Sequence, residues 1–202
     1  WYFVPTAAIN EEAKGVAFKN EIMGRLIRFV SSHEVGHTLG LPHNMGSSVA
    51  YPVDSLRSAT FTQKYGTAPS IMDYARFNYI AQPEDKGDAL MPNVGPYDKH
   101  SINWGYRPIL NQTADEEKAT LNQWILDKAD DPIYRFGRQQ RPVIDPSSQT
   151  EDLGDDAVKA SNYGIANLKR IVPKLIEWTY ENGKNYDDLG ELYNQVFSQF
   201  NR

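Results

Sequence analysis

The chain has 202 residues, of which 40% are hydrophobic and 12% aromatic, and this suits one globular domain or slightly more. Its formal net charge of −5, without a basic patch, argues against a nucleic-acid partner. The absence of cysteine excludes disulfide bonds and thiolate metal ligands, and no apolar run has the length of a membrane-spanning helix.

The first residues, WYFVPTAAINEEAKG, lack the basic start and the apolar stretch of a signal peptide. They also lack an initiating methionine. We therefore interpret the chain as a piece of a longer or processed protein, and we expect residues 1–9 to be extended.

A helical pattern covers residues 11–39, where apolar residues and two histidines recur at spacings of three and four. The members of this stripe are Met23, Leu26, Val30, His33 and His37. Residues at these spacings share one face of a helix, so we expect the stripe to face the interior. Gly40 offers a stop for the helix, and Pro42 follows it closely.

The remainder of the chain is expected to be helices joined by loops and irregular segments. The predicted helices cover residues 54–65, 97–104, 114–128, 155–180 and 186–200. The segment 130–154 is rich in Asp, Pro, Gly, Ser and Gln, which is typical of irregular structure. Because strand signals are few and short, the predicted fold class is mostly α.

The residues with the clearest chemistry lie at 33–43, which read HEVGHTLGLPH. His33 and His37 are one helical turn apart, so both imidazoles can point at one ion. Gly40 permits a sharp reversal of the backbone, after which His43 returns towards the same ion. Three neutral nitrogen ligands leave a fourth position for water, which is the pattern of a catalytic zinc site.

Glu34 is adjacent to His33 and is poorly placed to ligate the same ion, but it can reach a zinc-bound water. Zn²⁺ lowers the pKa of such a water to about 7. We expect Glu34 to act as general base towards this water and then as general acid towards the leaving amine. The alternative is that these are ordinary surface or core histidines. Against it, three of the four histidines in the chain fall within this window.

The motif HExxHxxGxxH followed by a methionine turn is the metzincin signature. Residues 33–43, together with SIMDY at 70–74, resemble it. The resemblance implies that Met72 is the turn methionine beneath the zinc ligands. In astacins and serralysins a tyrosine two residues later approaches the zinc, so Tyr74 is expected to be an extra ligand or an oxyanion donor. The alternative for Tyr74 is a buried aromatic near the site, and Asp73 could orient a neighbouring group.

Three longer segments narrow the resemblance, and they read FVSSHEVGHTLGLPHN, GPYDKHSINWGYRP and GDDAVKASNYGIANLKRIVPKLIEWT. Together they resemble the Met-zincin catalytic domain of large secreted bacterial zinc-dependent metalloproteases, over most of residues 15–195. The resemblance implies a zinc-dependent endopeptidase that acts on proteins or peptides outside the cytoplasm or in the cell envelope. One departure is Asn44 after the third histidine, which matches none of the better-studied metzincin subfamilies well.

Metzincins place a twisted sheet before the active-site helix, and its edge strand binds the substrate backbone. Only about ten residues precede that helix here. We therefore expect an upstream part of the same polypeptide to supply the sheet and complete the cleft.

Within the catalytic domain we divide the chain into two parts. Residues 1–130 would hold the active-site helix, the zinc-binding loop, the methionine turn and the following helices, and residues 131–202 would form a helical C-terminal part. The rival hypothesis is a non-catalytic, zinc-containing binding or structural module of a larger secreted protein.

Two further features have a simpler interpretation beside the functional one. His100 is expected at the surface or near the site rather than on the metal. The acidic residues Glu151, Asp152, Asp155 and Asp156 could bind calcium. We favour a role in capping the next helix, because the twelve-residue calcium-loop pattern is absent.

Overall fold

The computed structural model describes residues 2–75, 77–87 and 89–201, and the regular structure within them is helical, without a strand. The prediction of a mostly α fold is therefore confirmed. The α-helices are α1 (Phe3–Thr6), α2 (Asn20–Thr38), α3 (Val53–Leu56), α4 (Ala59–Tyr65), α5 (Pro96–Tyr106), α6 (Ala114–Leu126), α7 (Ala157–Ile171), α8 (Leu175–Thr179) and α9 (Asp187–Phe200). Short 3-10 helices are η1 (Glu11–Ala13), η2 (Ser48–Ala50), η3 (Pro83–Asp85), η4 (Pro132–Tyr134) and η5 (Val172–Lys174). In this described part, every helix is too short or too polar to cross a bilayer.

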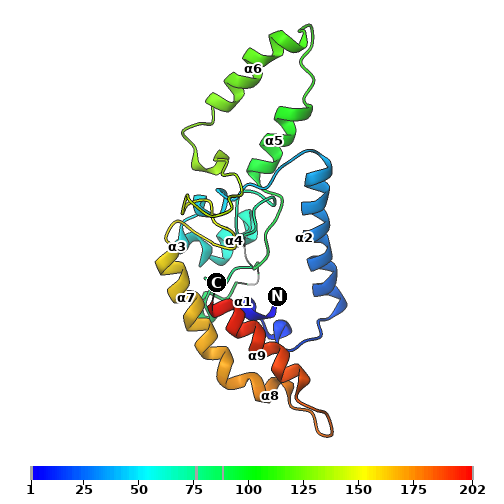
Figure 1. The fold of residues 1–202 in the computed structure, drawn as a ribbon, viewed down its shortest axis with the longest axis vertical. Helices are drawn as coiled ribbons and strands as arrows, with labels where there is room; N and C mark the ends of the chain where they lie inside the picture. Colours follow the sequence, from blue (N-terminus) through cyan, green and yellow to red (C-terminus); the bar gives the residue numbers. More distant parts are fainter. Residues whose placement is uncertain (1, 76, 88, 202) are drawn as a thin grey trace.

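The molecule is elongated, and its long helices lie around a centre made of loops and short helices (Figure 1). Helices α5 and α6 form one end, and α7, α8 and α9 form the other. Helix α2 runs along one edge between them. At the second end α1 packs against both α7 and α9, so segments from the two ends of the chain lie together.

Two hydrophobic clusters hold these elements together. The first joins α1, α2, α7, α8 and α9, and its buried members are Tyr2, Val4, Ala7, Ala13, Ile22, Phe77, Met91, Leu168, Ile171, Leu175, Leu192 and Val196. The second lies around α3 and the start of α7, with Tyr51, Val53, Leu56, Ala68, Ala75, Ile80, Leu153 and Ala160. The second cluster includes residues that flank the segment 70–74 in the chain, so it anchors that turn from both sides.

Helix α2 packs on the molecule through a narrower face than the sequence predicts. His33 is buried, and Leu26 and His37 are partly buried, as expected. Met23 and Val30 are 43% and 45% exposed, so the prediction that the whole stripe faces the interior is wrong for these two residues. They lie instead on a neighbouring stripe, because α2 is at the edge of the molecule and only one of its sides meets other elements.

The predicted extended conformation of residues 1–9 is also wrong, since Phe3–Thr6 form the short helix α1. Thr6 Oγ1 donates a hydrogen bond to the Tyr2 carbonyl oxygen at 2.6 Å, which closes the turn. Pro5 is tolerated because it lies in the first turn, where a helix needs no backbone N–H. Trp1 lies outside the described residues.

Three predicted helices are interrupted in the structure. The pattern over residues 11–39 divides at Gly15, whose φ of +102° is incompatible with a right-handed helix. The pattern over 54–65 becomes α3 and α4, because Ser58 accepts the Phe61 N–H and starts a new helix. The pattern over 155–180 breaks at Pro173, which follows the end of α7.

The helices expected over 97–104, 114–128 and 186–200 are confirmed as α5, α6 and α9.

Candidate metal centre

The three histidines of the motif come together at the C-terminal end of α2. His33 and His37 lie one turn apart on this helix, which ends at Thr38. Gly40 follows with a φ of +82°, so the predicted reversal of the chain is present. A side chain at Gly40 would meet no atom within 4 Å. The requirement for glycine here is therefore its positive φ rather than space.

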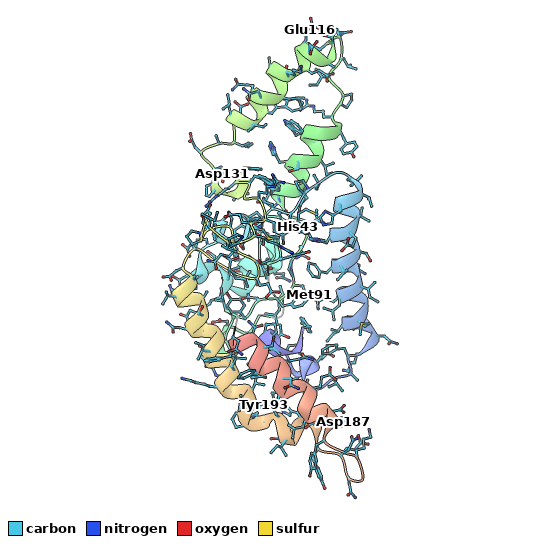
Figure 2. The ribbon with its side chains drawn as sticks, in the orientation of Figure 1. His43, Met91, Glu116, Asp131, Asp187 and Tyr193 are labelled. Atoms are coloured by element: carbon cyan, nitrogen blue, oxygen red, sulfur yellow. The ribbon has the colours of Figure 1, made fainter. Side chains whose placement is uncertain are left out.

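The reversal brings the Nε2 atom of His43 to 3.3 Å from that of His33 and 3.0 Å from that of His37. With Zn–N bonds of 2.0–2.1 Å, tetrahedral ligand atoms are about 3.3 Å apart. The spacing of the three nitrogens therefore fits a single small ion. Figure 2 labels His43 among the side chains gathered between α2 and the central loops.

Each imidazole is oriented by a hydrogen bond between its Nδ1 atom and a neighbouring oxygen atom. His33 Nδ1 lies 2.7 Å from the Ile71 carbonyl oxygen, and His37 Nδ1 lies 2.9 Å from that of Leu41. His43 Nδ1 lies 3.1 Å from Oε1 of Gln139. These oxygens can only accept, so Nδ1 carries the proton in all three rings and Nε2 keeps its lone pair free. This is the arrangement that metal-ligating histidines require.

The protonation state of His33 also suits a ligand. Burial lowers the pKa of His33, and the neighbouring imidazoles of His37 and His43 lower it further. A neutral imidazole is the form that binds a metal ion.

The turn at residues 70–74 packs against the part of α2 that carries His33 and His37. Met72 is fully buried, and a Cβ added at Gly36 would lie 2.3 Å from its sulfur. Gly36 stands between His33 and His37 on α2, so the methionine packs directly against the helix face that carries the two histidines. The Met72 carbonyl oxygen accepts the Asn44 N–H at 3.0 Å, which joins the turn to the loop after His43.

Asp98 of α5 is a residue that the sequence analysis did not identify. Its carboxylate accepts hydrogen bonds from Ser70 Oγ at 2.6 Å, from the Ile71 N–H at 2.8 Å and from the Gly95 N–H at 2.7 Å. Since the Ile71 carbonyl oxygen receives His33, Asp98 holds the peptide that orients this ligand. The local sequence signals only the capping of α5, where Asp98 follows Gly95 and Pro96 in the first turn. The contacts with Ser70 and Ile71 join segments 28 and 27 residues apart, and they could not be read from it.

Glu34 and Tyr74 lie on the open side of the centre. Glu34 follows His33 on α2 and is exposed to solvent. The Tyr74 ring lies 4.4 Å from that of His43 and is stacked on that of His33 at 5.5 Å, measured between ring centroids. Tyr74 is 40% exposed, so it is not a buried aromatic of the core. A substrate approaching the histidines from solvent would meet both residues.

Asp73 holds the loop at Ser48. Its carboxylate is 1% exposed and accepts the Ser48 N–H at 2.6 Å. The hydroxyl of the same Ser48 donates to Asp152 at 2.9 Å. Burial raises the pKa of Asp73, and the nearby carboxylate of Asp152 raises it further. Burial also raises the pKa of Asp152 to about 6.

The acidic residues at 151–156 bind different parts of the molecule. Asp156 is the N-cap of α7 and accepts the Lys159 N–H at 2.9 Å, so the favoured capping role is confirmed for this residue. Asp155 accepts the Val53 N–H at 2.9 Å. Among residues 2–75, 77–87 and 89–201, the side chains that gather as a potential metal site are His33, His37 and His43. His100 is outside this group, with its ring 5.1 Å from that of Tyr134.

A family model described as DUF4953: Met-zincin matches residues 15–202. A search of the curated proteins found no match. A search of the solved structures found none either.

The raised pKa of Asp152 generates a prediction for stability. Its carboxyl ionises near pH 4 when unfolded but near pH 6 when folded, so its ionisation lowers the free energy of unfolding as pH rises between these values. Asp152→Asn can still accept from Ser48 and removes a charge near Asp73. Urea unfolding should therefore show the variant gaining stability relative to the wild type between about pH 4 and pH 7. The exposed Asp130→Asn is the control, and a difference that is constant with pH would contradict the prediction.

Proposed function

The chain belongs to the Met-zincin family, and from this premise we propose that it carries the catalytic site of a zinc-dependent endopeptidase. The observation that carries the proposal is the convergence of three Nε2 atoms beside a solvent-exposed glutamate. Their spacing and tautomers fit zinc, and His33, His37 and His43 would hold it. The family further supports export of the protein to the cell exterior or envelope.

The proposed mechanism assigns proton transfer to Glu34. Bound Zn²⁺ would supply Lewis acidity, which lowers the pKa of a coordinated water to about 7 and polarises the scissile carbonyl. Glu34 takes the proton of the attacking water as general base and returns it to the leaving amine as general acid. Its exposed position on α2 leaves its carboxylate accessible to a substrate arriving from solvent.

A cavity beside the metal loop supports a peptide as the substrate. It has a volume of about 620 Å³ and is lined by residues that include Leu41, Pro42, Tyr97, Trp104 and Phe136. Leu41 and Pro42 immediately precede His43. An apolar and aromatic wall against the loop that leads to His43 is suited to the side chain of a bound peptide.

The central test is Glu34→Ala. Loss of the general base should lower peptide hydrolysis by about 10²–10⁴-fold, while zinc content stays near that of the wild type because the three imidazoles are untouched. Hydrolysis of a mixed peptide library is followed by mass spectrometry and zinc by elemental analysis. Glu21→Ala, an exposed glutamate in the first turn of the same helix, is the matched control.

Two outcomes of this experiment would change the proposal. Full activity of Glu34→Ala would exclude the assigned role of this residue. A wild-type parent polypeptide that binds zinc but cleaves no peptide in the library would support the rival function, a non-catalytic zinc-containing module.

We also propose that Tyr74 donates a hydrogen bond to the oxyanion that forms during hydrolysis. The support is the position of its ring against His43 and His33 on the open side of the centre. An extra role as a zinc ligand is the alternative within the same site.

Replacement of Tyr74 by Phe separates these roles. An oxyanion donor predicts a fall in kcat of about 10²–10³-fold with KM and zinc affinity near the wild-type values. A fall in zinc affinity would instead identify Tyr74 as a ligand, and unchanged kcat together with unchanged zinc affinity would exclude both roles. Tyr65→Phe is the matched control, because Tyr65 is 41% exposed and belongs to a separate aromatic cluster with Tyr51 and Phe61.

The substrate cleft is proposed to include an upstream part of the same polypeptide. Met23, Ile27 and Val30 are 43%, 58% and 45% exposed, and their spacings of four and three place them on one face of α2. Glu34 continues this face four residues after Val30. A segment that covers the apolar part of the face would therefore end beside Glu34 and form the second wall of the cleft.

Covalent surface labelling can test this arrangement. In the parent polypeptide, labelling of Met23, Ile27 and Val30 should fall several-fold relative to this chain alone, because the upstream segment removes their side chains from water. The exposed Ile176 on α8 serves as the reference in both samples. Equal labelling of the α2 face in the two samples would contradict the proposed second wall.

A further inference from the structure

The irregular segment around residues 135–139 crosses the loop that carries His43. Asn44 Nδ2 donates to the Arg135 carbonyl oxygen at 2.9 Å, and Asn44 Oδ1 accepts the Gly137 N–H at 2.8 Å. The Met45 N–H donates to the Gly137 carbonyl oxygen at 2.7 Å. The two segments are more than 90 residues apart in sequence, so these bonds are tertiary.

The backbones of the two segments touch at Gly46 and Gly137, so neither segment can move towards the other without a clash. A Cβ at Gly137 would lie 2.7 Å from the backbone nitrogen of Gly46, and a Cβ at Gly46 would lie 2.9 Å from that of Gly137. Real Cβ atoms do not approach backbone so closely, and both glycines are therefore needed for the backbones to touch. Asn44 is 0% exposed, and its donor and acceptor are both used in this contact.

Gln139 lies two residues beyond Gly137 and reaches the metal centre. Its Oε1 is 3.1 Å from Nδ1 of His43. His33 and His37 are oriented by backbone carbonyl oxygens, whereas the acceptor described for His43 belongs to a side chain. A side chain keeps its orientation only if its own backbone is fixed, and the bonds of Asn44 fix that backbone.

We propose that Asn44 and Gln139 act together as positioning residues for His43. Asn44 secures the segment at Arg135 and Gly137, and Gln139 then holds the His43 ring with its Nε2 directed at those of His33 and His37, where the three would hold zinc. The inference rests on the proposed metal site, but it concerns the affinity of that site rather than hydrolysis. It also assigns a function to the residue after the third histidine, which in this chain is asparagine.

The test is zinc affinity, measured on the full chain by competition with a chelator. Loss of the acceptor in Gln139→Ala should weaken zinc binding by about 10–100-fold, as for other residues that orient metal ligands. Gln139→Glu keeps an acceptor for the imidazole N–H and should bind within a few-fold of the wild type. The absorption spectrum of the Co²⁺-substituted protein should change in Gln139→Ala, because the coordination of His43 is disturbed.

Gln140→Ala is the matched control. Gln140 Oε1 accepts the N–H groups of Ile144 and Asp145 at 2.9 Å, so this neighbour serves its own turn rather than the metal centre. Its replacement should leave zinc affinity and the Co²⁺ spectrum unchanged. Unchanged zinc affinity in Gln139→Ala would overturn the role of Gln139.

The coupling of the two residues is tested by a double-mutant cycle. Asn44→Ala should weaken zinc binding. The variant with both changes, Asn44→Ala and Gln139→Ala, should have the same zinc affinity as whichever single variant binds zinc less tightly, because both residues act through His43. Fully additive losses would overturn the link between them. If Asn44→Ala does not fold, Asn44→Asp retains the acceptor for Gly137 and takes its place in the cycle. A wild-type chain that binds no zinc would refute the metal site itself, which is a different result from any of these.

Discussion

The reversal of the chain at Gly40 is the constraint on which the metal centre depends. Two histidines one turn apart on α2 supply two ligand atoms from the same side of the ion. The third ligand must come from a chain that turns back towards them. A residue other than glycine at a φ of +82° would cost about 1–2 kcal/mol. Gly36 meets a different demand in the same motif, because its backbone is helical and only the contact with Met72 excludes a side chain.

The orientation of the ligands comes from segments that are distant in sequence. His33 depends on Ile71, which Asp98 holds in turn, and His43 depends on Gln139. His37 alone finds its acceptor nearby, at Leu41. The centre therefore joins the methionine turn, α5 and the segment 135–139 to the end of α2. Formation of the site and folding of the central part of the molecule are linked for this reason.

The metal centre is accessible to solvent because α2 packs on the core through only one of its faces. The helix packs on the core through Ile22, Leu26 and His33, and the adjacent stripe of Met23, Ile27 and Val30 faces solvent. Glu34 stands on this open side, where a substrate can reach it. Helix α2 thus has two apolar stripes: one is buried against the core, and the other is exposed and free to bind another segment.

The sequence by itself determined the mostly α fold, three of the later helices, the three histidines and the reversal at Gly40. Each of these depends on local spacing or on the conformational range of one residue. It did not determine the short helix α1 or the exposure of Met23 and Val30, because these depend on which side of each segment meets the core. The break in the predicted helix at 155–180 has a local cause, Pro173, which the apolar spacing of that segment masked. The roles of Asp98, Asn44 and Gln139 were decided only by the tertiary structure. Their hydrogen bonds to other segments join residues 27 to 96 positions apart, and no periodic pattern records contacts at such separations.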